Sequence, residues 1–178
     1  VEERIVRPTV EGLQQDGIAY KGFLFIGLMN VAGDPYVIEY NVRMGDPETE
    51  VVLPRITSDL IAMFEGIAYG RLDRYTLEVS PQTAVTVVCV SGGYPGDYVK
   101  GMEISGLDTP TQSIVFHAGT TAKGDKTYTA GGRVLAVTSL GDSIAEALHA
   151  SYNTIGGIAY EGKNFRRDIG QDLIGLLK

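Results

Sequence analysis

The chain has 178 residues and a formal net charge of −7, from 15 Lys and Arg against 22 Asp and Glu. This acidic balance argues against nucleic acid or an anionic membrane surface as the main partner, although it allows a local basic pocket for one phosphate. A single cysteine cannot form an internal disulfide, and the apolar stretches 23–29 and 84–90 are far shorter than the ~20 residues that span a bilayer. We therefore expect a soluble, cytoplasmic protein.

The N-terminal part of the sequence predicts a helix followed by a hairpin. Residues 1–16 carry apolar side chains at helical spacing and predict an amphipathic helix. Residues 21–30 and 36–43 are strand-like runs, and the loop 31–35 between them is typical of a hairpin connection. The segment 48–70 has a helical pattern that breaks at the proline in position 54 and can be capped again at position 57 or 58.

From about Val79 the sequence changes to short β-branched runs separated by glycine-rich turns. Strands are expected there at 84–90, 113–117, 133–139 and 158–160. Helices are expected from Asp142 or Ser143 to Tyr152 and over 172–178. We therefore expect an α+β chain, with helices and a hairpin over 1–78 and a small β-rich domain with one main helix over 79–178.

Three polar residues of the second strand are candidates for chemistry. Glu39, Asn41 and Arg43 are expected on one face, because side chains alternate along a strand. A carboxylate and an amide oxygen at this spacing converge on a hard cation such as Mg²⁺, which takes oxygen ligands and keeps substrate phosphates in its shell. The arginine next along can hold an anionic substrate group. A solvated strand face explains the same alternation, so the pattern alone leaves both interpretations open.

The tetrapeptide Gly-Asp-Pro-Glu follows directly at 45–48. Pro47 favours a helix start, and Glu48 lies where a helix dipole favours a carboxylate, which explains the segment as a cap. The functional alternative is that Asp46 and Glu48 cluster with Arg43 within six residues, beside the possible cation site.

The densest positive cluster of this acidic chain consists of Lys163, Arg166 and Arg167. The segment 157–164 nearly matches a phosphate-binding G-x4-G-K-[ST] loop, but it has Asn164 where a hydroxyl should coordinate Mg²⁺. We therefore reject a P-loop, and the cluster is either a phosphomonoester pocket or a solvated basic turn. Cys89 lies in an apolar run typical of a core, which leaves nucleophilic catalysis without a candidate.

Several segments together resemble one enzyme family. They are Glu-Tyr-Asn-Val-Arg-Met-Gly-Asp-Pro-Glu-Thr at 39–49, Gly-Gly-Tyr-Pro-Gly-Asp-Tyr at 92–98, Phe-His-Ala-Gly-Thr at 116–120 and Arg-Arg-Asp-Ile-Gly at 166–170. Over nearly its whole length the sequence is similar to the phosphoribosylamine–glycine ligases (glycinamide ribonucleotide synthetases), which are ATP-grasp enzymes of purine synthesis. Glu-x-Asn is common to many ATP-grasp enzymes, whereas the runs through 45–48 and 92–98 are specific to this ligase.

The resemblance implies the C-terminal part of an ATP-grasp unit, an antiparallel sheet with helices, over 1–78. It implies a small barrel-sandwich-like, β-rich C-terminal domain over 79–178. The implied reaction is phosphorylation of the glycine carboxylate by ATP, followed by attack of the amine of 5-phosphoribosylamine on the glycyl phosphate. Its products are glycinamide ribonucleotide, ADP and phosphate.

The resemblance also implies roles for single residues. Glu39 and Asn41 are expected to be ligands of Mg²⁺ or Mn²⁺ that bridges the ATP phosphates. Arg43 is expected to be a catalytic residue at an anionic group of glycine or of the acyl phosphate. The implied substrate-binding residues are Asp46, Glu48, Lys163, Arg166 and Arg167, the last three for the phosphoribosyl phosphate.

Two departures from the family pattern qualify this interpretation. Many ATP-grasp relatives supply a second carboxylate from the preceding strand, but residues 22–29 contain none, so we expect water to complete the metal shell. The family's N-terminal domain and the first part of its ATP-grasp unit are missing before Val1. We therefore expect this segment to need the N-terminal part of the same enzyme and not to catalyse ligation alone. The alternatives are another ATP-grasp carboxylate–amine ligase and a non-catalytic binding or assembly domain.

Overall fold

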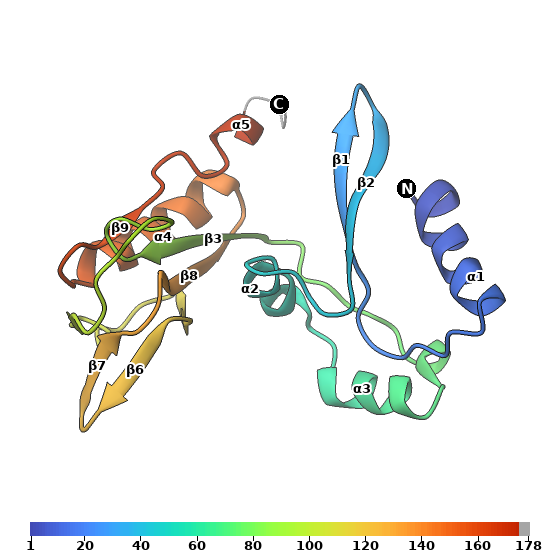
Figure 1. The fold of residues 1–178 in the computed structure, drawn as a ribbon, viewed down its shortest axis with the longest axis horizontal. Coiled ribbons are helices and arrows are strands. Elements are labelled where there is room, and N and C mark those ends of the chain that lie inside the picture. The colour runs from blue at the N-terminus through green and yellow to red at the C-terminus, as the bar shows by residue number, and fades with distance from the viewer. Residues whose placement is uncertain (175–178) are drawn as a thin grey trace. The chain divides into compact units, whose positions relative to one another are not determined.

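The structure is a computed structural model that describes residues 1–174, and it contains two compact units (Figure 1). The hairpin unit comprises residues 1–46 and 58–78. The sheet unit comprises residues 47–57 and the chain from residue 79 onward. The segment 47–57 thus belongs to the sheet unit, whereas the sequence places it before the expected boundary at 78/79. The sequence boundary misses this because helix α2 (Thr49–Val52) of the segment packs on strand β3 (Thr83–Val90) of the sheet unit, which is distant in sequence.

In the hairpin unit, the predicted N-terminal helix is present as a π-helical turn η1 (Glu2–Val6) that continues into α1 (Arg7–Gln15). Strands β1 (Phe25–Val31) and β2 (Asp34–Asn41) form an antiparallel hairpin. Ala32 and Gly33 connect them with positive φ angles of 52° and 94°, the conformation of the two-residue turn that matches strand twist. The predicted hairpin is therefore confirmed, with a tighter loop than expected.

The rest of the hairpin unit is helix α3 (Leu60–Ala68) and the short 3₁₀ helix η3 (Leu72–Arg74). The side chain of Asp59 caps α3 by accepting a 3.0 Å hydrogen bond from the N–H of Ala62, so the cap expected at position 57 or 58 is wrong. Ser58 instead accepts from the N–H of Glu78 and donates to the carbonyl of Thr76, which ties the two ends of this segment together.

Two antiparallel sheets make up the described strands of the sheet unit. The larger has the order β5 (Ile114–His117), β8 (Arg133–Gly141), β3 (Thr83–Val90), β9 (Asn164–Phe165). The smaller has the order β4 (Glu103–Ile104), β7 (Lys126–Thr129), β6 (Thr120–Lys123). The described helices of the sheet unit are α2 (Thr49–Val52), the 3₁₀ turn η2 (Leu53–Arg55), α4 (Ile144–Gly157) and α5 (Gln171–Ile174).

Helix α4 covers one face of the larger sheet (Figure 1). The core between them contains the fully buried Val87, Cys89, Leu135 and Ile155. Along β3 the inward residues are buried and the outward residues are half-buried, because alternate side chains point to opposite faces. The outer face of β3 therefore stays accessible to other parts of the unit.

Some predicted elements need correction. Ser143 caps α4 as expected, but the helix continues to Gly157 rather than ending at Tyr152. The strand expected at 158–160 is wrong, since only a single bridge joins Ala159 to Ser105. The described part of the predicted terminal helix is α5, and residues 175–178 lie outside the described chain. No helix in residues 1–174 is long and apolar enough to span a membrane.

Candidate functional site

Strand β2 places Glu39 and Asn41 side by side, as the alternation predicts. The amide Nδ2 of Asn41 donates a 2.8 Å hydrogen bond to Oε1 of Glu39. This bond uses the amide nitrogen and leaves the amide oxygen for other partners. Arg43 follows just after the strand, where its Nη1 donates to the carbonyl oxygen of Met44 at 3.0 Å. The sequence thus predicted the juxtaposition of the carboxylate and the carboxamide.

A β-bulge and a glycine position the Glu39 side chain. Gly27 pairs with Glu39 and Leu28 pairs with Val37, so Ile38 is an extra residue that bends the strand beside the carboxylate. A Cβ atom at Gly27 would lie 3.1 Å from Cγ of Glu39, closer than comfortable packing allows. The missing side chain at Gly27 therefore makes room for Glu39. The sequence signal was a glycine inside a strand, which often marks a bulge or a close approach.

The oxygen atoms of the Glu39–Asn41 pair suit a magnesium ion as ligands. Glu39 and Asn41 offer a carboxylate and an amide oxygen, which are ligands of hard cations. Within residues 1–174, no group of three or more His, Cys, Asp or Glu side chains could hold a metal ion. These residues would therefore supply one side of the coordination shell. This fits Mg²⁺, which usually keeps several waters and binds through one or two carboxylates plus substrate phosphates.

The acidic residues of the Gly-Asp-Pro-Glu segment are both exposed. Asp46 ends the first stretch of the hairpin unit, and Glu48 is the N-cap residue of α2 but makes no side-chain capping hydrogen bond. Glu48 lines a pocket of about 350 Å³ in the sheet unit, together with Val51 and Ile144. A helix therefore begins at this segment, as the cap interpretation predicts, although Glu48 makes no side-chain hydrogen bond to it.

The three basic residues near the C-terminus do not share one pocket. Lys163 points its Nζ at the C-terminal end of α4, where it donates to the carbonyl oxygens of Ile155, at 2.7 Å, and Ile158. Because its ammonium already binds the end of a helix, the geometry favours a structural role for Lys163 over the predicted phosphate contact.

The two arginines of the cluster have different partners. Arg166 donates from Nε and Nη2 to the two carboxylate oxygens of Asp168, at 3.0 and 2.9 Å. This ion pair raises the pKa of Arg166 and lowers the pKa of Asp168. Arg167 lies over the ring of Phe165, with its guanidinium carbon 5.2 Å from the ring centroid. Arg166 and Arg167 therefore remain exposed cations with donors available to a ligand.

The outer face of β3 forms the floor of a pocket of about 490 Å³. Its lining residues come from β3, β8, β9, the loops that follow β3 and β9, and the segment before α2: Pro47, Thr86, Val88, Val90, Tyr94, Pro95, Arg133, Asn164, Phe165, Arg166 and Ile169. Arg133 was not singled out from the sequence, because only the pairing of β8 with β3 brings it to this face.

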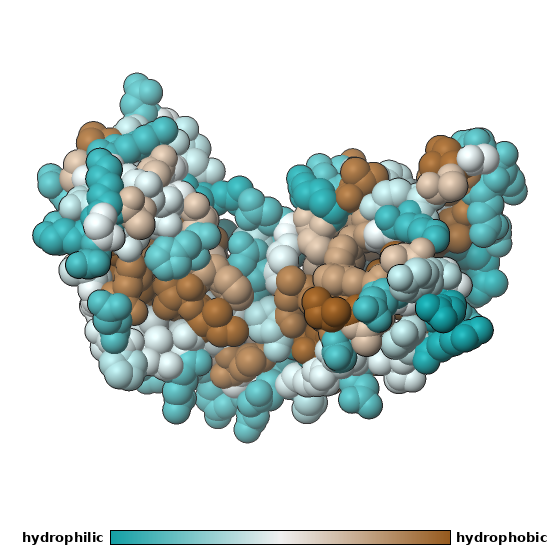
Figure 2. Space-filling model, turned by 90° about the horizontal axis from the view of Figure 1, so that it is seen from below, coloured by the Kyte–Doolittle hydropathy of each residue, from teal (hydrophilic) through white to brown (hydrophobic). Residues whose placement is uncertain are grey.

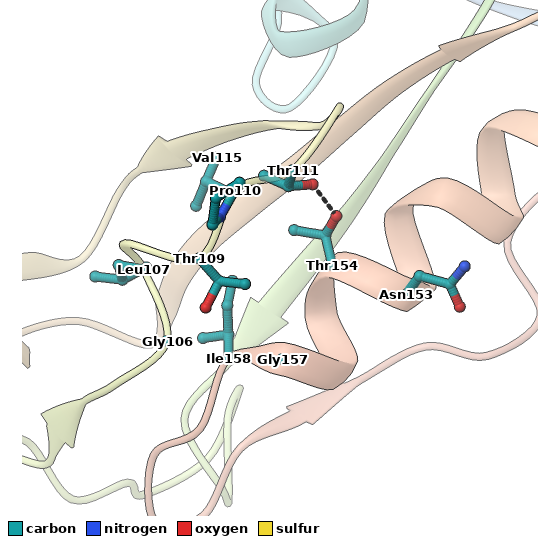
Figure 3. A pocket seen from close by; sticks show the side chains of 10 residues that line it. All are labelled: Gly106, Leu107, Thr109, Pro110, Thr111, Val115, Asn153, Thr154, Gly157 and Ile158. Atoms are coloured by element: carbon teal, nitrogen blue, oxygen red, sulfur yellow. Dashed lines mark hydrogen bonds between the residues drawn. The ribbon is translucent and has the colours of Figure 1, made fainter.

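A smaller cavity of about 180 Å³ lies beside the C-terminal end of α4 (Figure 3). Its polar lining includes Thr109, Thr111, Asn153 and Thr154, and the hydroxyls of Thr111 and Thr154 are hydrogen-bonded to each other. No charged side chain of residues 1–174 lines it, so it offers little to an ionic substrate.

Cys89 is fully buried in β3, which confirms its assignment to the core. Burial raises the pKa of the Cys89 thiol to about 11. A thiol with such a pKa is neutral at physiological pH and is a poor nucleophile.

Comparison with known proteins agrees with the motifs of the sequence. The ATP-grasp (A) domain model of phosphoribosylglycinamide synthetase matches residues 1–49, and the C-domain model of the same family matches residues 84–172. The chain belongs to the phosphoribosylglycinamide synthetase family. The resemblance inferred from residues 39–49 and 92–98 is thereby confirmed.

Named relatives give the same result. The phosphoribosylamine–glycine ligase of Caldanaerobacter subterraneus subsp. tengcongensis is 44% identical over 95% of this chain, and that of Neisseria meningitidis serogroup B is 47% identical over 96%. The crystal structure of the Thermotoga maritima ligase superposes with a TM-score of 0.82 at 38% identity, over 93% of this chain. The chain spans about 40% of the length of these relatives (40%, 41% and 41%).

A more distant structure supports the fold. The biotin carboxylase domain of the Hydrogenobacter thermophilus 2-oxoglutarate carboxylase matches 92% of this chain with a TM-score of 0.61 at 16% identity. This similarity, together with the ligase structure, confirms the expected α+β fold of an ATP-grasp unit followed by a β-rich domain.

Proposed function

We propose that this chain is the C-terminal part of a phosphoribosylamine–glycine ligase, in which it supplies one side of the metal site and part of the substrate site. The reaction would join glycine to 5-phosphoribosylamine through a glycyl phosphate, with ATP as co-substrate. The observation that carries the proposal is the hydrogen-bonded Glu39–Asn41 pair, inside a chain that matches both domains of the family. We propose a cytoplasmic location and the N-terminal part of the same enzyme as partner.

Glu39 and Asn41 would hold a Mg²⁺ or Mn²⁺ ion. When bound, the ion would neutralise charge on the nucleotide phosphates during phosphoryl transfer. The Asn41 amide restrains the Glu39 carboxylate through its 2.8 Å hydrogen bond, and the space at Gly27 allows that orientation. The pair is therefore preorganised, so little side-chain entropy is lost when the ion binds.

Arg43 would be the catalytic residue of this chain. Its guanidinium lies just beyond the strand that carries the proposed metal ligands, and a planar fork of N–H donors suits a carboxylate or acyl phosphate. Asp46 and Glu48 would face the substrates, since both side chains are exposed. Arg166 and Arg167 would contact the phosphoribosyl phosphate.

The surface of the hairpin unit supports the need for further chain. Large apolar side chains are exposed on β2 and just after it, among them Ile38 (61%) and Val42 (72%), and brown apolar surface is visible in Figure 2. A single two-stranded hairpin cannot cover both of its faces by itself. We propose that the remainder of the ATP-grasp unit covers them, and that the segment alone forms no ATP- and glycine-dependent product.

The metal assignment is tested in the full-length protein with Glu39→Gln. Manganese titration by electron paramagnetic resonance in the presence of ATP should show weaker Mn²⁺ binding by on the order of 10- to 100-fold, since a charged ligand becomes a neutral amide. Glu11→Gln makes the same change on the exposed surface of α1 and should bind Mn²⁺ normally. Normal turnover of Glu39→Gln at limiting metal would refute the assignment.

The phosphate contacts are tested by comparing substrates. Arg167→Ala should raise the apparent KM for phosphoribosylamine roughly 10-fold and leave that for ATP within about twofold, because one charge-assisted contact is lost. Equal effects on both substrates would indicate a structural role for Arg167.

A further inference from the structure

The paired part of the β1–β2 hairpin ends between the proposed metal ligands and Arg43. Its last register pair joins Phe25 to Asn41, the residue at which β2 ends. Glu39 and Asn41 therefore lie where strand pairing holds the backbone, and their side chains are bonded to each other. Arg43 lies two residues beyond the last pair, so strand pairing does not fix its position.

A tyrosine from the loop between α1 and β1 spans this end of the hairpin. The hydroxyl of Tyr20 donates to the carbonyl oxygen of Phe23 at 2.5 Å and to that of Val42 at 3.1 Å. A hydroxyl has a single hydrogen, which is shared here between the two acceptors. The side chain thus links the chain before β1 to the chain after β2, at the point where the strand pairing stops.

The hydrogen bond to Val42 also orients the residue that follows. A peptide group is planar, so its carbonyl oxygen, its nitrogen and the next Cα keep fixed relative positions. The contact with Tyr20 therefore restrains the plane that contains the nitrogen and the Cα of Arg43. The guanidinium of Arg43 is exposed and bonds to the carbonyl of its neighbour Met44. Tyr20 thus acts on the base of this side chain and leaves its charged end accessible.

The loop that carries Tyr20 is itself supported by helix α3. Lys21 donates from Nζ to the carbonyl oxygen of Ala68, at the C-terminal end of α3, at 2.8 Å. The ring of Phe23 packs edge-on against that of Phe64 on α3, with the centroids 5.9 Å apart. The residues around Tyr20 are therefore fixed to the helix, and the hydroxyl is presented from a supported position.

A glycine leaves room for the hydroxyl. Gly22 has a φ of 142°, a conformation that favours glycine over other residues. A Cβ atom at this position would lie 3.1 Å from the hydroxyl oxygen of Tyr20. A side chain at position 22 would therefore strain the backbone and crowd the hydroxyl at the same time. The Tyr-Lys-Gly segment at 20–22 is suited to keep the hydroxyl where it is.

We propose that Tyr20 is a positioning residue for Arg43, because its hydroxyl holds the Val42 peptide and so directs the guanidinium towards its anionic group. This rests on the proposed function and adds to it a residue from outside the strand. A tyrosine that only stabilised the hairpin would affect the Glu39–Asn41 pair and Arg43 alike. A positioning residue affects Arg43 alone, since strand pairing already holds the two metal ligands.

The test is a double-mutant cycle in the full-length protein with Tyr20→Phe and Arg43→Ala. Tyr20→Phe should lower kcat roughly 10-fold, but should change it less than about twofold once Arg43 is alanine, because no guanidinium is then left to position. Mn²⁺ binding in the presence of ATP should stay within about twofold in Tyr20→Phe. Tyr36→Phe is the matched control, since it removes a hydroxyl from an exposed ring of the same hairpin and should leave kcat unchanged.

Nuclear magnetic resonance gives a readout that does not depend on turnover. With arginine labelled by ¹⁵N, the backbone signal of Arg43 is the one that disappears in Arg43→Ala. Its order parameter should fall from about 0.85, typical of rigid backbone, towards about 0.6 in Tyr20→Phe. The same signal should not change in Tyr36→Phe.

The outcomes separate this inference from the proposed function. An unchanged kcat or an unchanged Arg43 order parameter in Tyr20→Phe overturns the positioning role, as does a 10-fold loss that persists when Arg43 is alanine. Mn²⁺ binding that weakens as much as kcat falls would make Tyr20 a brace of the whole hairpin and also overturn it. In each of these cases the unaltered protein is still a ligase. Absence of ligase product from the unaltered full-length protein overturns the proposed function itself.

Discussion

Replacing Lys163 with methionine should destabilise the sheet unit without weakening substrate binding. Lys163 is half-buried, and its ammonium donates to the carbonyl oxygens of Ile155 and Ile158 at the end of α4. The last carbonyl groups of a helix have no partner within the helix, and a positive charge there also interacts favourably with the helix dipole. Methionine preserves the length of the side chain and removes the charged donor.

The expected loss follows from these contacts. A hydrogen bond with a charged partner contributes about 1.5–3 kcal/mol, and a charge at a helix terminus contributes ~0.3–1 kcal/mol. Ile155 and Ile158 are 0% and 1% exposed, so water replaces the lost donor poorly. We therefore expect a loss of about 2–4 kcal/mol, which lowers the unfolding midpoint of a unit of this size by ~10 °C or more.

Calorimetry and amide hydrogen exchange over residues 144–158 of the full-length protein measure this loss. Lys126→Met should leave the stability close to that of the unaltered protein, because it removes only an exposed ion pair. The KM for phosphoribosylamine should stay within about twofold in Lys163→Met. A large rise in that KM with unchanged exchange protection of α4 would refute the structural role and restore Lys163 to the phosphate site.

Three further changes test other parts of the chain. Gly27→Ala should weaken Mn²⁺ binding by roughly 10-fold, because its Cβ displaces Glu39, whereas Gly12→Ala, which meets no atom within 4 Å, should not. Leu135→Ala should lower the free energy of unfolding by about 2–5 kcal/mol in urea titrations, since the side chain is fully buried. The pKa of Cys89 is raised to about 11 by burial, so the unfolded chain loses this proton first. Stability should therefore fall as pH rises from about 9 towards 11, by ~3 kcal/mol, and Cys89→Ala should remove that slope in urea titrations at several pH values.

The metal pair was predictable because it depends on local geometry alone. Alternation along one strand is enough to place Glu39 and Asn41 on a common face. Gly27 inside a strand run signals a bulge or a close approach, but the position of the extra residue, Ile38, depends on the pairing of β2 with β1 and does not follow from the sequence. Local patterns therefore located the two side chains, while the cross-strand partner determines the space around them.

The surroundings of the basic cluster, in contrast, could not be predicted from local sequence. Lys163, Arg166 and Arg167 are adjacent in sequence, yet Lys163 binds a helix end and only Arg166 of the three lines the pocket of β3. Arg133 is distant in sequence but reaches that pocket because β8 and β9 flank the same strand. Sequence proximity is a poor guide to a shared ligand in an antiparallel sheet, where strand order decides which side chains meet. Two glycines just before β8 have different neighbours: a Cβ at Gly132 would overlap the ring of Tyr94 from the loop at 92–98, whereas Gly131 lies against Gly119 and its carbonyl accepts from the Ser91 hydroxyl.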